Sequence, residues 1–99
     1  MHNKIARLSY GQLVLLNWFL GHPKSYGTVE QLEKNTPLKS KSLGGVLSSL
    51  SRTKFRGISL IEPYGKATHG GGLRWKLSRA IGDITKTKRE VRRMLATYK

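Results

Sequence analysis

Cysteine is absent from the sequence, and this absence excludes several classes of protein. A disulfide scaffold, a zinc site with thiolate ligands, an iron–sulfur cluster and a thiol nucleophile all require cysteine. Histidine is scarce too, and His2, His22 and His69 lack the spacing of metal ligands. We therefore expect neither a metal site nor a cofactor.

Acidic residues are also few. Five Asp and Glu face nineteen Lys and Arg, which gives a net charge of +14. A metal-dependent nuclease needs several converging carboxylates, and only Glu30 and Glu33 lie close together along the chain. The sequence contains no phosphate loop, nucleophile elbow or dinucleotide fingerprint. We expect a protein that is not an enzyme and whose positive field attracts polyanions.

Long apolar runs are missing. The longest, residues 13–20, is interrupted by Asn17 and is much shorter than the ~20 residues that cross a bilayer. The Gly-His-Pro-Lys that follows does not resemble a signal-peptide cleavage site. We expect an intracellular protein without membrane contact, in the cytoplasm or nucleoid, or in the nucleus if the source is eukaryotic.

A chain of 99 residues is long enough for one domain with one modest core, so residues 1–99 are predicted to form a single domain. Its charge is uneven. Residues 41–99 hold fourteen of the nineteen basic residues and three of the five acidic ones. The surface that meets a partner is therefore expected to come mostly from the second half.

Three helices are predicted in the first half. Ser9 and Thr28 each begin a capping box, with Gln three residues later. The first helix is expected at about 9–20, and the short second helix ends at 35–37. A third helix over 40–53, capped by Ser40 or Ser42, turns a set of apolar residues inward: Leu43, Val46, Leu47 and Leu50.

Beyond Gly57 the pattern changes to strands. Residues 58–60 and 73–77 alternate in polarity, and Gly65–Gly72 forms a turn-rich loop between them, which predicts a hairpin. Pro63 is expected either to end the first strand or to mark its edge. Ser78 is expected to cap a last helix over 79–98. The predicted fold class is mostly α with a small β-hairpin.

The order helix, short helix, turn, helix, hairpin, helix resembles the winged helix-turn-helix superfamily. Its spacing of apolar residues is matched by Leu38, Leu43, Leu47 and Leu50, and residues 28–78 look like its core. The glycine-rich loop and residues 72–77 resemble the wing of bacterial regulators and that of the linker-histone globular domain. One departure is a longer segment between Leu50 and Gly57.

The resemblance implies a three-helix core with a wing, within residues 9–78, followed by a C-terminal helix. It implies a transcription regulator or architectural chromatin protein that binds double-stranded DNA, with helix 40–53 in the major groove and the wing, 63–77, beside it. The expected contacts are Lys41, Ser42, Ser48, Ser49 and Arg52 on the helix and Lys66, Arg74 and Lys76 on the wing.

The last helix is basic and amphipathic. Glu90 is the one acid among five bases, so a polyanion would relieve their mutual repulsion. These bases are expected to add phosphate contacts: Lys86, Lys88, Arg89, Arg92 and Arg93. The stripe formed by Ile84, Val91 and Tyr98 predicts either packing on the first helix or pairing with a second copy as a homodimer.

Other interpretations remain open at this point. Gly44 and Gly45 are compatible with close helix–helix packing as well as with close approach to DNA. A basic protein of this kind could instead bind RNA or associate with a ribosome. A third alternative is a protein-interaction module whose basic face docks an acidic partner.

Strong, salt-sensitive binding to duplex DNA is the prediction that follows from the charge. If about six phosphates are neutralised, log affinity should fall against log salt concentration with a slope of about −5. Fluorescence anisotropy with a labelled duplex at several salt concentrations measures this slope. A flat response would contradict a phosphate-dominated interface.

Overall fold

The computed structural model describes residues 5–23, 26–55, 57–66 and 73–98, leaving aside the side chains at 40, 64, 66 and 73. These ranges contain helices α2 (Tyr10–Gly21), α3 (Val29–Asn35), α4 (Ser40–Arg52) and α5 (Ile84–Leu95). They also contain strands β1 (Lys54–Phe55), β2 (Ile58–Ser59), β3 (Ile61–Lys66) and β4 (Leu73–Leu77) and the 3-10 helix η1 (Arg79–Ile81). The fold is mostly helical with a small antiparallel hairpin, as predicted. No helix in the described ranges is long and apolar enough to cross a membrane.

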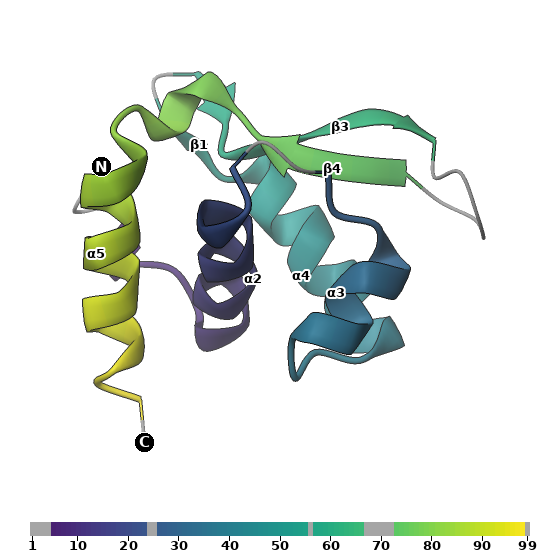
Figure 1. Cartoon of the computed structure of the whole chain (residues 1–99), viewed down its shortest axis with the longest axis horizontal. Helices are drawn as coiled ribbons and strands as arrows, with labels where there is room; N and C mark the ends of the chain where they lie inside the picture. The colour runs from purple at the N-terminus through teal and green to yellow at the C-terminus, as the bar shows by residue number, and fades with distance from the viewer. Residues whose placement is uncertain (1–4, 24–25, 56, 67–72, 99) are drawn as a thin grey trace.

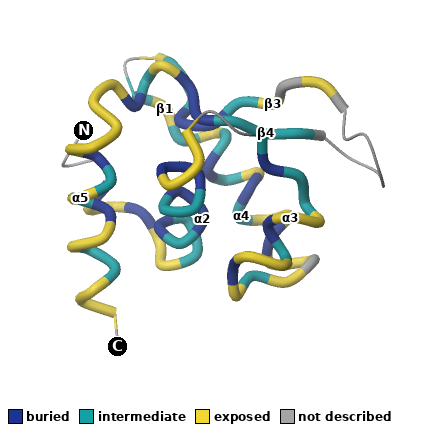
Figure 2. Tube along the Cα trace, viewed as in Figure 1, coloured by how far each residue is buried: buried dark blue, intermediate teal, exposed yellow. Residues whose placement is uncertain are grey.

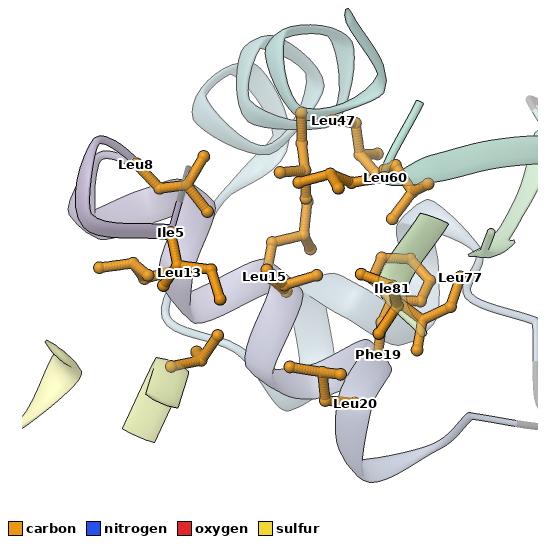
Figure 3. Packing of buried hydrophobic residues seen from close by; sticks show 14 of the residues in the cluster. Ile5, Leu8, Leu13, Leu15, Phe19, Leu20, Leu47, Leu60, Leu77 and Ile81 are labelled. Atoms are coloured by element: carbon orange, nitrogen blue, oxygen red, sulfur yellow. The ribbon is translucent and has the colours of Figure 1, made fainter. Parts of the chain in front are cut away.

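Helix α2 lies at the centre of the molecule, between α5 on one side and α3 and α4 on the other (Figure 1). Its residues Leu13, Leu15, Leu16, Phe19 and Leu20 are buried and face in several directions. A helix that is apolar on most of its circumference must be covered by several neighbours. Side chains from α4, η1 and β4 meet it in the core, which Figure 3 shows from close by.

Both predicted capping boxes form. Ser9 Oγ accepts a hydrogen bond from Gln12 N at 3.2 Å, and Gln12 Oε1 accepts one from Ser9 N at 2.8 Å. Thr28 and Gln31 make the equivalent pair at the start of α3. The expected serine cap of α4 is wrong, because the N-cap residue is Lys39, which makes no side-chain cap.

The β-structure differs from the prediction in its pairing. Residues 58–59 do not pair with 73–77 but with β1, in a short hairpin that turns at Gly57, whose φ is 80°. The partner of β4 is β3, in which Pro63 lies opposite Trp75. Trp75 also exchanges two backbone hydrogen bonds with Gly27 on its other side, at 2.7 and 2.8 Å. Pro63 is therefore on an edge strand, which agrees with one of its two predicted positions. The other is wrong, because Pro63 does not end the strand, which continues to Lys66.

The last helix was predicted over 79–98, and its predicted start is wrong, because α5 begins at Ile84. Ser78 caps only η1, and Gly82 then adopts a φ of 66° that an α-helix cannot contain. Asp83 begins α5 afresh by accepting a hydrogen bond from Lys86 N at 3.0 Å. Ile81 consequently belongs to η1 and to the core, not to a stripe along α5.

Helix α5 packs on α2 within the same chain. Val91 and Thr87 are buried, and the Thr87 hydroxyl donates to Ile81 O at 3.3 Å. Figure 2 shows buried and exposed stretches alternating along α5. Of the predicted stripe only Val91 is buried, since Ile84 is 36% and Tyr98 46% exposed. Two roles were predicted for this stripe, and the structure shows the first of them, packing on the first helix.

Val91→Asp should lower the free energy of unfolding by about 3 kcal/mol or more, because it places a carboxylate in the α2–α5 interface. Ile84→Asp is the matched control: its side chain is partly exposed at the helix N-terminus, where a negative charge is favourable. Urea denaturation followed by circular dichroism measures both. Equal stability of the two variants would mean that α5 is not docked in solution.

Candidate nucleic-acid interface

Helix α4 buries one side and exposes the other. Leu43, Leu47 and Leu50 are buried against the core. The exposed side forms what we call the α4 face: Lys41, Gly44, Gly45, Ser48 and Arg52. These positions follow one another at helical spacing, so they lie on one line that runs about 16 Å from Lys41 to Arg52 at 1.5 Å per residue.

The two glycines of the α4 face have no packing role. Beyond the adjacent residues and the backbone of α4 itself, a Cβ atom added at Gly44 or Gly45 would have no atom of the described residues within 4 Å. The close approach of helices occurs instead at Gly11 of α2, where an added Cβ would lie 3.0 Å from Val46 Cγ2. The helix–helix packing interpretation of Gly44 and Gly45 is therefore wrong, and they leave the backbone of α4 open to solvent.

Ser49 does not lie on the outer face, and its predicted outward placement is wrong. Its hydroxyl accepts a hydrogen bond from Gln12 Nε2 at 3.0 Å and donates to Val46 O at 3.2 Å. The side-chain oxygen of Gln12 is used in the capping box of α2, so its amide joins the start of α2 to α4. Ser42 and Ser48 are exposed, as predicted.

The longer segment after Leu50 forms the β1–β2 hairpin. Thr53 anchors the end of α4 by donating its hydroxyl to Ser49 O at 3.0 Å, and its carbonyl accepts from Leu60 N at 3.0 Å. Helix α4 therefore continues through Arg52, which stays on the same exposed line as Lys41. Arg56 lies outside the described residues.

The cations of the β3–β4 hairpin are less available than predicted. Arg74 is half-buried, with its guanidinium carbon 4.6 Å from the centre of the Tyr26 ring. Gly65, with φ 77°, leaves room for it, since a Cβ there would lie 3.0 Å from Arg74 Nη2. Lys76 is half-buried opposite Glu62. The side chain of Lys66, and the loop residues Thr68 and His69, lie outside the described part.

The bases of α5 form a separate group. Lys86 and Arg89 are exposed and Lys88 is half-buried. Arg92 Nε donates to Asn17 Oδ1 of α2 at 3.4 Å, and Arg93 forms an ion pair with Glu90. Because α2 lies between α5 and α4 (Figure 1), the predicted phosphate contacts on α5 belong to a helix on the other side of α2 from α4.

Comparison with protein-family models, with curated proteins and with solved structures finds no match to this chain. Among the residues that the structure describes, no three His, Asp or Glu side chains gather as metal ligands would.

Gly44→Ala and Gly45→Ala should each raise the free energy of unfolding by about 0.5–1 kcal/mol, because alanine favours a helix and its methyl group meets open space here. Gly11→Ala should lack most of this gain, since Val46 must move to admit the methyl group. Thermal and urea denaturation of the three variants give the comparison. A lower free energy of unfolding for Gly45→Ala would mean that a neighbouring group occupies the space beside Gly45.

Proposed function

We propose that this chain is a winged helix-turn-helix protein that binds duplex DNA, as a transcription regulator or an architectural chromatin protein. Helix α4 is the recognition helix and the β3–β4 hairpin is the wing. The observation that carries the proposal is the α4 face itself. It has two open glycines between two exposed cations, on a helix that contains no acidic residue.

The connection between α3 and α4 supports this architecture. The turn is short, and Thr36 organises it by donating its hydroxyl to Leu32 O at 2.6 Å and accepting from Leu38 N at 3.3 Å. Such a turn holds the two helices in a fixed relation, as a helix-turn-helix requires. The β3–β4 hairpin extends past α3 and α4 at the edge of the molecule (Figure 1), where a wing would meet the same duplex.

The α4 face is suited to phosphates more than to bases. Small residues let a phosphate or a groove wall come close to the helix backbone, and the serine hydroxyls can donate to phosphate oxygens. The N-cap Lys39 supplies no side-chain acceptor to the first turn of α4, and an external anion could accept from its N–H groups. The side chains of Lys41 and Arg52 are long enough to reach guanine, and α4 has no Asn or Gln for adenine. We therefore propose binding of modest sequence specificity.

Gly45→Leu should weaken duplex binding about tenfold or more, a loss of about 1.4 kcal/mol, because the side chain keeps the helix away from the groove. Gly21→Leu is the matched control, since Gly21 is also a helical glycine with open space around it. Anisotropy titrations with one labelled duplex compare the two variants, and circular dichroism checks that both fold. Equal affinities for the two variants would remove α4 from the interface.

Lys41→Ala should change the preference among duplex sequences by about 1–3 kcal/mol where a preference exists, because a base contact distinguishes sequences. Arg74→Ala should weaken all duplexes alike. Competition with random and selected duplexes separates the two effects.

A structured RNA hairpin that displaces duplex DNA at equal concentration would favour an RNA-binding protein instead. No affinity for either nucleic acid would favour a protein partner of acidic surface.

A further inference from the structure

The outer side of α5 carries a row of cations. The α5 face, as we define it, consists of Lys86, Arg89 and Arg93, spaced three and four residues apart and therefore stacked along the helix. Lys86 and Arg89 are exposed. Within the described residues, neither lies within salt-bridge distance of an acid, and the Glu90 carboxylate pairs with Arg93.

The rest of α5 already accounts for how the helix is held. Val91 and Thr87 are buried towards α2, and Met94 and Leu95 pack at the border of the core. Like charges three and four residues apart destabilise a helix, so the repulsion of Arg89 by Lys86 and Arg93 opposes the formation of α5, and the Glu90–Arg93 ion pair offsets part of it. An external polyanion would turn this repulsion into attraction.

The α5 face and the α4 face lie on helices that pack on different sides of α2 (Figure 1). Each helix buries its apolar residues in the core, Leu43 and Leu47 on α4 and Val91 on α5, so the exposed α4 face and α5 face lie on the outer sides of their helices. Packed helices lie about 8–10 Å apart, so the axes of α4 and α5 are separated by roughly twice that distance. A duplex seated on α4 leaves the α5 face directed towards solvent.

We propose that the α5 face binds a second duplex, so that one copy of this chain bridges two DNA segments. This inference rests on the proposed function for its first duplex. Lys86 and Arg93 are about 10 Å apart along the helix axis, similar to the rise of three base pairs at 3.4 Å each. Aligned cations of this kind contact backbone phosphates and not base edges, so the second site is indifferent to sequence.

The number of duplexes held by one chain tests the proposal. The probe is a blunt duplex of about 12 base pairs, a little over one helical turn, added in excess at low salt. Analytical ultracentrifugation with separate detection of protein and DNA gives the composition of the complex. The wild-type chain should hold two duplexes, and Lys86→Gln/Arg89→Gln should hold one, with the affinity of the first duplex kept within about threefold.

Two further variants serve as controls. Lys34→Gln/Arg79→Gln removes the same charge from positions off both faces and should still hold two duplexes. Lys86→Arg/Arg89→Lys keeps the charge of the α5 face and should also hold two. Glutamine favours helices nearly as well as lysine and arginine, so α5 should form in every variant, which circular dichroism verifies.

One duplex per wild-type chain at saturation would overturn the proposal, as would two duplexes on the Lys86→Gln/Arg89→Gln variant. Two chains with two duplexes would overturn it as well, because dimerisation would then explain the bridging. These results differ from a failure of the α4 interface. If one duplex binds and Gly45→Leu weakens it, the proposed function stands without the bridge. If Gly45→Leu changes nothing, the α4 assignment fails.

Discussion

The need to cover α2 shapes the whole molecule. Its buried side chains, among them Leu13, Leu15 and Phe19, point in directions that no single neighbour can cover. Helices α4 and α5 and strand β4 surround it, and each contributes mainly the apolar side of its own amphipathic pattern. Most of the basic residues of α4 and α5 are therefore exposed on the outer sides of these helices, while Arg92 bonds to Asn17 of α2. The surface charge of this protein is arranged by the packing of its central helix.

Polar contacts at the edge of this core fix details that burial alone leaves free. The amide of Gln12 joins the cap of α2 to Ser49, and Thr53 holds the end of α4 to the following hairpin. Trp75 connects β4 to Gly27 through the backbone. The first two bonds add to the burial of Leu43, Leu47 and Leu50 in holding α4, whose exposed residues run from Lys41 to Arg52.

The exposed glycines of α4 are costly for stability. A glycine within a helix costs up to about 1 kcal/mol relative to alanine, and here no neighbouring side chain needs the space. The like charges of α5 are a second cost of the same kind. Both features lie on the outer sides of helices, where packing imposes no constraint. Such local conflicts with stability are expected where a surface serves binding.

The sequence by itself determined what depends on neighbours a few residues away. Capping boxes at Ser9 and Thr28 and the apolar side of α4 were all predictable, because hydrogen bonds and periodicity within one segment decide them. The sequence also contains the signals for the break at Gly82 and the new cap at Asp83, since glycine often ends a helix and aspartate often begins one. The apolar pattern, which continues across both residues, favoured a single helix instead. Only the tertiary structure decided that β3 pairs with β4, that Ser49 turns towards Gln12 and that Arg74 lies against Tyr26. It also separated the bases of α4 from those of α5. These outcomes depend on contacts between distant segments, whose geometry the packing around α2 sets.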